Sequence, residues 1–402
     1  MLHIAIPLLE ELENIPTLLK TIAAQKHANY KVYFCVNQPD AWWGNLDKIA
    51  ACNNNQASIK LILETATFPF EIIDKSSLGQ GWKAKKIGVG WARKTLLDKI
   101  LEVANDKDII ISLDADTSFS ENYFSSIEDN LQQHPKSPAI AVAYYHPLSN
   151  SEAEDRAILR YEIYMRHYLI NLFRINSPYA FSALGSAIAM PIWALRKIGG
   201  MTPKKSGEDF YLLQKMVKFR PILNWNSEKV YPAARFSDRV FFGTGPAMIK
   251  GNEGDWSSYP IYSMELFNKI ATFYKIIPQL FLANLSTPID SVFGDQKACN
   301  TLWDNLRKNN KDLAHFTKAV HDKFDGLRIL QFLKQSEETY RLNAEKSLIE
   351  FIKNTSSETS NISIFNNLSF EKSPISQLNE IRDYLCNIED DYRQNAWKQY
   401  GK

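Results

Sequence analysis

Residues 1–150 alternate between short apolar runs and segments of helical spacing, and this alternation most constrains the fold. The apolar runs of strand length are residues 3–9, 31–37, 70–74, 108–116 and 139–146. Helical spacing occurs at residues 13–25, 82–104 and 120–133. Strands that alternate with helices form a largely parallel sheet flanked by helices. The pattern predicts a Rossmann-like α/β fold that binds its ligand beyond the carboxyl ends of the strands.

The second half of the chain follows a different pattern. Residues 157–175 form a long amphipathic helix candidate, and residues 182–190 are rich in small residues and turn-like. Strand signals fade beyond about residue 260, where charged helical segments take over. We therefore expect two domains, an α/β domain at residues 1–255 and a helical C-terminal extension at residues 256–402.

Composition argues against several classes of protein. The formal net charge of +2 gives no strong electrostatic case for nucleic-acid binding. The four cysteines contain no C-x-x-C pair, which argues against a zinc site and for a reduced, cytoplasmic protein. The N-terminus has no basic signal region, and the longest apolar stretches are too short to span a bilayer. A peripheral contact at the inner face of the membrane and a homodimer stay open.

The fourth apolar run ends in two aspartates, Asp114 and Asp116. Such hard oxygen ligands suit Mg²⁺ or Mn²⁺ together with a diphosphate. One alternative is a pair of solvated acids at a strand–helix junction, with Asp116 or Thr117 as a helix cap. Another is a haloacid-dehalogenase-type phosphatase, although that motif usually lies on the first strand, with Thr or Val where this chain has Ser118.

Two further patterns are compatible with catalysis. Glu208 and Asp209 open an amphipathic helix, and Asp209 could act as a general base if it faces a cleft. The alternative is that both acids only complement the helix dipole. The small residues around Gly185, in "GSAIAM", would let a backbone approach a ligand closely, or would simply pack.

Basic residues suggest an anionic ligand. Arg235 and Arg239 lie four residues apart and could clamp a diphosphate, or form surface salt bridges. Residues 76–90, "SSLGQGWKAKKIGVG", place glycines and three lysines before a helix, as a wrap around an anion would require. Their spacing matches neither a P-loop nor a dinucleotide-binding fingerprint.

In their order along residues 1–250, these motifs resemble those of family-2 glycosyltransferases of the GT-A fold. The D-x-D and E-D motifs carry most of the resemblance. The chain departs from the family in reading "GWKAKKIG" where G-K-x-x-A-L-N is frequent, and in lacking Q-x-x-R-W. The resemblance implies nucleotide-sugar contacts from Pro7, Glu10, Asp40, Asp74, Lys83, Asp114, Gly185, Arg235 and Arg239, a metal at Asp116 and Asp114, and catalysis by Asp209 with Glu208.

The implied activity is inverting, metal-dependent transfer of a sugar in polysaccharide biosynthesis. The donor would be a nucleotide-diphosphate sugar, with a UDP-sugar favoured, and the acceptor a hydroxyl of a glycan or lipid-linked precursor. Tyr179, Phe181 and His146 are candidates to line the acceptor side. The alternatives are a non-catalytic GT-A module that binds nucleotide sugar or glycan, and a nucleotidyltransferase. A nucleotidyltransferase would want a glycine-rich, basic signature after the first strand, where this chain is acidic.

Overall fold

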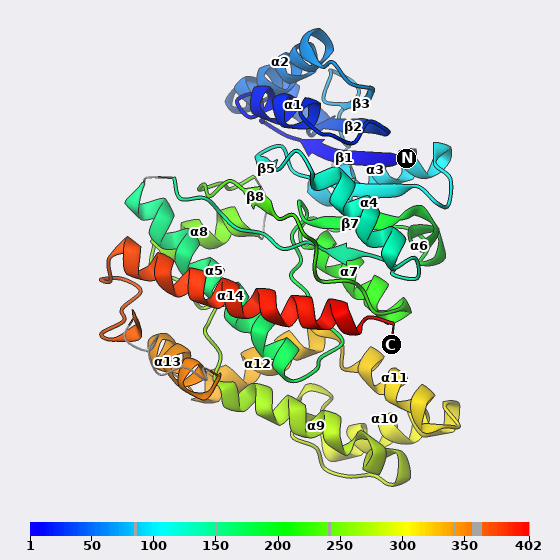
Figure 1. Ribbon diagram of the computed structural model, residues 1–402, viewed down its shortest axis with the longest axis vertical. Helices are drawn as coiled ribbons and strands as arrows, with labels where there is room; N and C mark the ends of the chain where they lie inside the picture. The colour runs from blue at the N-terminus through cyan, green and yellow to red at the C-terminus, as the bar shows by residue number, and fades with distance from the viewer. Residues whose placement is uncertain (84–86, 150, 240–242, 341–342, 356–363, 402) are drawn as a thin grey trace. The chain divides into compact units, whose positions relative to one another are not determined.

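The computed structural model describes residues 1–83, 87–149, 151–239, 243–340, 343–355 and 364–401 (Figure 1). The chain divides into two compact units, and each contains separate pieces of the sequence. Unit 1 comprises Met1–Tyr161, Phe181–Trp256 and Asp390–Lys402, and unit 2 comprises Glu162–Ala180 and Ser257–Glu389. The division into domains at residue 255 stays a prediction.

Unit 1 is built on a six-stranded sheet of order β3-β2-β1-β4-β7-β6. Neighbouring strands among β3, β2, β1 and β4 pair in parallel, whereas β7 pairs antiparallel with both β4 and β6. The strands are β1 (Leu2–Leu8), β2 (Tyr30–Asn37), β3 (Phe70–Lys75), β4 (Ile109–Ser112), β6 (Ile140–Ala141) and β7 (Ile188–Pro191). The predicted α/β class with a mostly parallel sheet is confirmed.

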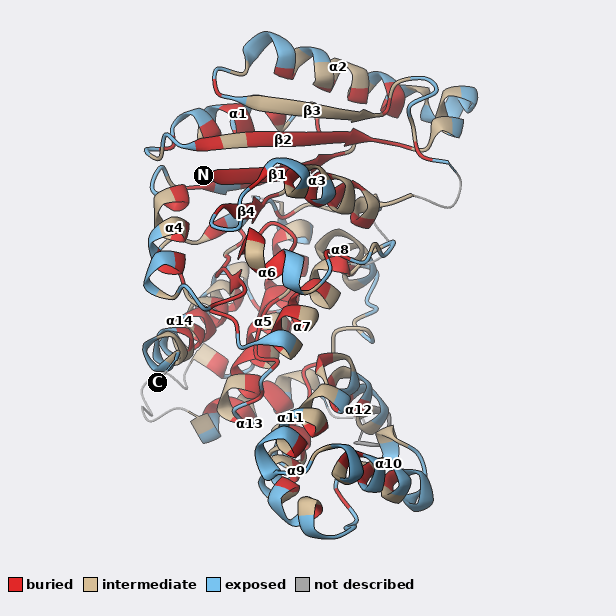
Figure 2. Ribbon diagram, turned by 90° about the vertical axis from the view of Figure 1, so that its right-hand side faces the viewer, coloured by how far each residue is buried: buried red, intermediate tan, exposed pale blue. Residues whose placement is uncertain are grey.

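Helices follow the strands of unit 1, although the helix between β2 and β3 was not predicted from the sequence. They are α1 (Ile15–Ala23), α2 (Ile49–Thr65), α3 (Val89–Val103), α4 (Tyr123–Gln133), α6 (Ile192–Lys197), α7 (Glu208–Phe219) and α8 (Thr244–Asn252), with short 3₁₀ turns at Asp40–Gly44 and Leu46–Lys48. Helix α3 packs against β1 and β2. Every residue of β1 is buried, and Figure 2 shows β1 and β2 as the buried centre and β3 as a half-buried strand at the edge.

Three further elements differ from the expectation, each for a local reason. Helix α3 begins at Val89 rather than near residue 82, because Gly88 takes a φ of 100°, which lies outside the helical region. The small-residue segment expected to be a turn contains strand β7, a run of only four residues that follows Gly185, Ser186 and Ala187 and ends in Pro191. The run at residues 139–146 forms only the two-residue strand β6 and isolated bridges at Ile140 and Tyr144.

A second, two-stranded sheet joins the end of β4 to a distant segment. Strand β5 (Thr117–Phe119) pairs antiparallel with β8 (Val230–Pro232), so that Thr117 lies opposite Pro232. The amide of Ala233 donates to the carbonyl of Asp116 at 3.0 Å. This pairing sets the segment that carries Arg235 beside the D-x-D motif, although 119 residues separate them in the sequence.

The described part of unit 2 is helical, which confirms the predicted C-terminal helical extension. Its helices are α9 (Met264–Leu282), α10 (Gln296–Asn309), α11 (Leu313–Lys323), α12 (Gly326–Tyr340) and α13 (Ala344–Thr355), with most of α5 (Glu152–Arg174) and of α14 (Ile375–Gln399). A buried ion cluster joins α5 to α14, in which Arg166 donates to Glu162 at 3.0 Å and to Glu389 at 2.9 Å. None of the described helices has the length and apolar character needed to cross a membrane.

Candidate functional site

A cavity of about 250 Å³ lies in unit 1, at the carboxyl ends of β1 and β4. Its lining includes the loop after β1, the start of α3, the D-x-D loop after β4, the loop before β7, the start of α7, and the segment from the end of β8 to the start of α8. Of the residues predicted from the sequence, it brings together Pro7, Asp114, Asp116, Gly185, Glu208, Asp209, Arg235 and Arg239. His146 lines the cavity too. This is the edge of a parallel sheet at which ligands bind.

Arg93, from α3, joins the two acidic motifs on the floor of the cavity. Its guanidinium donates to Asp114 at 2.5 Å and to Glu208 at 3.0 Å, and also to the hydroxyl of Ser112 at 2.6 Å. Although burial opposes the charge, Asp114, Glu208 and Asp209 together raise the pKa of Arg93. Arg93 is therefore a permanent cation that fixes one carboxylate of each motif.

Gly185 makes room for this guanidinium. A Cβ atom at Gly185 would lie 2.0 Å from an Arg93 nitrogen, which is far inside van der Waals contact. The carbonyl of Gly185 instead accepts hydrogen bonds from Arg93 at 3.0 Å and from Ser112 at 2.7 Å. The glycine in "GSAIAM" is thus explained by the close approach of Arg93.

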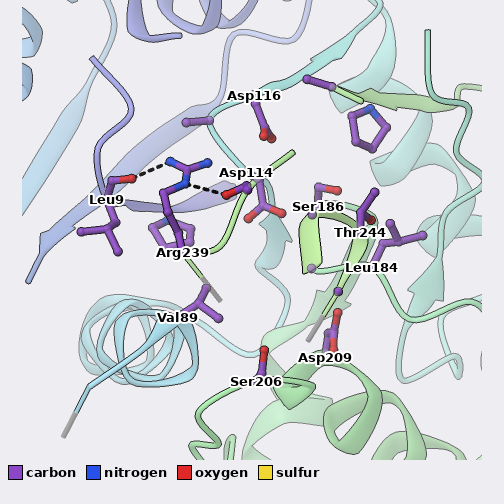
Figure 3. A pocket seen from close by; sticks show the side chains of 18 of the residues that line it. Leu9, Val89, Asp114, Asp116, Leu184, Ser186, Ser206, Asp209, Arg239 and Thr244 are labelled. Carbon is purple, nitrogen blue, oxygen red and sulfur yellow. Dashed lines mark hydrogen bonds between the residues drawn. The ribbon is translucent and has the colours of Figure 1, made fainter. Parts of the chain in front are cut away.

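Glu208 and Asp209 lie in the first turn of α7, where the helix dipole favours acids. The preceding residue, Gly207, has a φ of 74° and ends the loop that leads into the helix. Glu208 is buried against Arg93, whereas Asp209 is half-buried and lines the cavity. Figure 3 shows Asp114 between Asp116 and Asp209 in the view into the pocket.

Burial raises the pKa of Asp209 to about 7, with further contributions from Glu208 and Asp114. Arg93 and the amide of Phe210 act in the opposite direction. A carboxylate with a pKa near neutrality can accept a proton at physiological pH and is still partly ionised before it does so. These are the properties that a general base requires.

At the other end of the cavity, Asp116 shares its environment with two arginines. Arg235 donates to Asp116 at 2.7 Å and to Glu11 at 2.7 and 3.0 Å. Arg239 contacts Glu11 at 2.5 Å and donates to the carbonyl of Leu9 at 2.7 Å, the bond drawn in Figure 3. Burial raises the pKa of Asp116 to about 6, even though Arg235 lowers it.

The donor atoms of this region suit a divalent metal that arrives with a phosphate ligand. Within the described ranges, no group of three or more His, Cys, Asp or Glu side chains is arranged to hold a metal by itself. Mg²⁺ and related ions usually bind through one or two carboxylates and complete their shell with water and substrate phosphate oxygens. Asp116 and Asp114, with hard oxygen atoms in one cavity, fit that pattern.

Four predicted residues lie outside the set that lines the cavity: Asp74, Asp40, Glu10 and Lys83. Asp74 accepts hydrogen bonds from Ser76 and Ser77, which lower its pKa overall although burial opposes them. Asp40 accepts from the amide of Gly79 at 2.7 Å. The acid of the first loop that faces the cavity is Glu11 rather than Glu10.

The fourth, Lys83, is exposed, and the other two lysines of its segment, Lys85 and Lys86, lie outside the described residues. Of the two aromatic residues expected near an acceptor, Tyr179 is buried in unit 2, where its hydroxyl donates to the carbonyl of His321 at 2.9 Å. Phe181 is buried beside Phe210. Neither of these rings is among the residues that line the cavity.

Sequence reasoning missed two charged residues of the site, Arg93 and Glu11. Arg93 had a usable signal, because it lies on the apolar stripe of α3 with Leu96, Leu97 and Ile100. A charged residue at such a position is rarely buried unless it is paired. Glu11 had no comparable signal, since it is one of three acids within four residues of the first loop.

Comparison with protein-family models finds no match, and comparison with curated proteins finds none either. Solved structures do match. TarS residues 1–349 from S. aureus, in complex with UDP-GlcNAc, is 12% identical, with a TM-score of 0.38, over 100% of this chain and 93% of that one. The mannosyltransferase PcManGT from Pyrobaculum calidifontis, with GDP-Man and Mn²⁺, is 11% identical, with a TM-score of 0.39, over 100% and 88%.

Glucosyl-3-phosphoglycerate synthase from Mycobacterium tuberculosis, in complex with Mn²⁺, UDP-glucose and phosphoglyceric acid, also matches. It is 13% identical, with a TM-score of 0.35, over 56% of this chain and 69% of that one. All of these TM-scores are below 0.5, so the similarities carry no argument about the chemistry of this chain. The case for a function rests on the cavity.

Proposed function

We propose that the chain is an inverting glycosyltransferase of the GT-A type that transfers a sugar from a nucleotide-diphosphate donor to a hydroxyl acceptor. The observation that carries the proposal is the convergence of Asp114, Asp116, Asp209, Arg235 and Arg239 on one cavity at the carboxyl ends of the parallel strands. Those side chains can bind a diphosphate and deprotonate a hydroxyl. A UDP-sugar is the favoured donor, and a glycan or lipid-linked precursor the favoured acceptor.

Asp209 is the proposed general base. Its ionised form would take the proton of the acceptor hydroxyl while the oxygen attacks the anomeric carbon from the face opposite the diphosphate. The bond from that carbon to the diphosphate oxygen breaks in the same step, so the anomeric configuration inverts. Arg93 supports the geometry, because it ties Glu208, the neighbour of Asp209, to the D-x-D loop.

Arg235 and Arg239 are the proposed stabilisers of the leaving diphosphate. Their guanidinium groups can each donate paired hydrogen bonds to phosphate oxygens, which is the geometry that arginine provides and lysine does not. Asp116 and Asp114 would hold a divalent metal, Mn²⁺ or Mg²⁺, and that ion would supply further charge stabilisation to the diphosphate. Preorganised charges at the leaving group are among the largest contributions to catalysis.

A non-catalytic nucleotide-sugar or glycan-binding module is the second candidate. It would need the D-x-D and arginine end of the cavity, but it would gain nothing from a carboxylate with a near-neutral pKa at the other end. Asp209, with a pKa of about 7, therefore favours an enzyme over a binding module. Turnover of a donor sugar, with or without added acceptor, separates the two.

The first prediction concerns donor binding. In calorimetric titrations of UDP, GDP and TDP with Mn²⁺, we expect the wild-type protein to bind one nucleotide and to lose most of that binding in EDTA. Asp116→Ala should weaken the Mn²⁺-supported affinity at least about tenfold, because it removes a metal ligand. Asp98→Ala, at an exposed carboxylate paired only with Lys94 in the described structure, serves as the matched control and should not change binding. If no nucleotide binds under either condition, the proposed donor site is wrong.

A further inference from the structure

The two arginines of the cavity share one carboxylate, that of Glu11. Arg235 donates to both of its oxygens, at 2.7 and 3.0 Å, and a terminal nitrogen of Arg239 lies 2.5 Å from one of them. Glu11 is only 8% exposed. The groups that would clamp a diphosphate are therefore already paired with an internal anion.

The position of Glu11 is built by the loop around it. Glu10 takes a φ of 55°, a left-handed conformation that is uncommon for a residue other than glycine. The amide of Glu10 donates to Asn55 at 2.8 Å, and the side chain of Asn14 donates to Glu11 at 2.5 Å. A strained turn persists only where its surroundings fix it, and such turns cluster at functional sites.

Arg235 connects this carboxylate to the D-x-D motif. One of its nitrogens donates to Glu11 and also to Asp116, at 2.7 Å in each case. Arg235 and Arg239 bring two positive charges, and Glu11 and Asp116 bring two negative charges, so the cluster sums to zero. Asp114 lies outside this cluster and is paired with Arg93, which it shares with Glu208.

This charge balance disfavours the binding of a divalent cation alone or of a diphosphate alone. A divalent cation near Asp116 would be repelled by Arg235, which already donates a hydrogen bond to one oxygen of that carboxylate. A diphosphate near the arginines would be repelled by the carboxylates of Glu11 and Asp116. When both ligands are present, the diphosphate compensates the arginines and the cation compensates the carboxylates, so no like charges are left facing each other unscreened.

We propose that Glu11 is a positioning residue that acts as an internal counter-ion for Arg235 and Arg239 and makes the binding of cation and diphosphate interdependent. The inference rests on the proposed function. Arg235 exchanges its contacts with Glu11 and Asp116 for the diphosphate, and Asp116 thereby becomes available to a cation. Because coupling between two ligands is reciprocal, each ligand should strengthen the other by the same factor.

The test measures each ligand alone in the full-length chain. Mn²⁺ binding without nucleotide is followed by the electron paramagnetic resonance signal of free Mn²⁺, and UDP binding in EDTA by calorimetry. The variants are Arg235→Gln, which releases Asp116, and Glu11→Gln, which releases both arginines. Arg196→Gln, which removes an exposed ion pair with Asp106 outside the cavity, is the matched control. Circular dichroism checks that each variant is folded.

We expect Arg235→Gln to bind Mn²⁺ alone about tenfold more tightly than wild type, and Glu11→Gln to bind UDP alone about tenfold more tightly, as a coupling of typical size implies. Arg196→Gln should change neither affinity. A purely structural pair would give the opposite result, since its loss would weaken binding.

Two outcomes separate the inference from the function on which it rests. If wild type binds UDP with Mn²⁺ but neither variant gains affinity for its single ligand, the counter-ion role of Glu11 is overturned and the donor site stands. If wild type binds no UDP with or without Mn²⁺, both proposals fail.

Discussion

Asp209→Asn should abolish sugar transfer while leaving the donor site intact. The substitution keeps the shape of the side chain but removes the proton acceptor, and the loss of a positioned base typically costs about 10²- to 10⁴-fold in rate. We expect a fall of that size in kcat, measured by release of UDP from the donor in the presence of an acceptor. UDP binding with Mn²⁺ should be unchanged, because Asp209 lies at the other end of the cavity from Asp116 (Figure 3).

The pH dependence provides an independent signature of the same residue. Asp209 must be ionised to act as a base, and burial raises its pKa to about 7. The rate of sugar transfer by the wild-type protein should therefore rise as the pH increases through about 7 and then level off. The residual rate of Asp209→Asn should lack this rise. A wild-type profile that falls across that interval, or unchanged turnover in the variant, would show that Asp209 is not the base.

The stability of the variant serves as the control, and the sign follows from linkage. A carboxyl whose pKa is higher in the folded than in the unfolded state binds more protons when folded, so stability falls as the pH rises between the two pKa values. For Asp209 that interval runs from the ordinary pKa of an aspartate, 3.8, to about 7. At pH 8 the folded wild-type protein is destabilised by the ionised, buried carboxylate of Asp209, whereas Asp209→Asn carries no such charge. We therefore expect the variant to be at least as stable as wild type in urea, which would exclude misfolding as the cause of lost activity.

Arg93→Met should produce the largest loss of stability of the substitutions considered. Methionine fills a comparable volume but leaves Glu208 buried without its cation and Asp114 without a hydrogen-bond donor. Breaking a buried ion pair from one side typically costs about 3 to 5 kcal/mol, because the remaining charge is uncompensated. We expect a decrease of that size in the free energy of unfolding at pH 8, measured by circular dichroism in urea.

Two further variants separate the loss of a buried charge from a general effect of replacing arginine. Arg196→Met removes an exposed ion pair with Asp106 and hydrogen bonds to the carbonyls of Leu101 and Ala104, and should cost about 1 to 2 kcal/mol, less than Arg93→Met. The double variant Arg93→Met/Glu208→Gln should recover part of the loss, since it removes one of the stranded charges. Equal unfolding midpoints for Arg93→Met and wild type would contradict the central role of Arg93 in holding the two acidic motifs together.

The parts of the fold that could be predicted are those with a strong local pattern. The buried run of β1 and the isoleucines of β4 identify parallel strands by their composition alone. Strand β7 could not be found in this way, because its four residues directly follow the small residues Gly185, Ser186 and Ala187 and end in Pro191, a pattern typical of a turn. Its place in the sheet depends on pairing with β4, nearly 80 residues earlier in the chain. Long-range pairing of this kind leaves little trace in the sequence of the weaker strand.

The same division applies to the candidate site. The acids of the site could be identified from local sequence, because Asp114 and Asp116 follow a buried strand and Glu208 and Asp209 open a helix. Both motifs are set by the residues immediately around them. The sequence also determined that Arg235 and Arg239 are spaced to act as a pair.

Which arginine pairs with which carboxylate depends on the tertiary fold. The pairing of β5 with β8 brings Arg235 to Asp116, and the packing of α3 on the parallel strands brings Arg93 to Asp114 and Glu208. The fold also places Glu11, rather than Glu10, at the cavity. Ion pairs form between side chains that the fold brings within a few ångströms, whatever their separation in sequence, and so the charge balance of the cavity is a property of the folded chain.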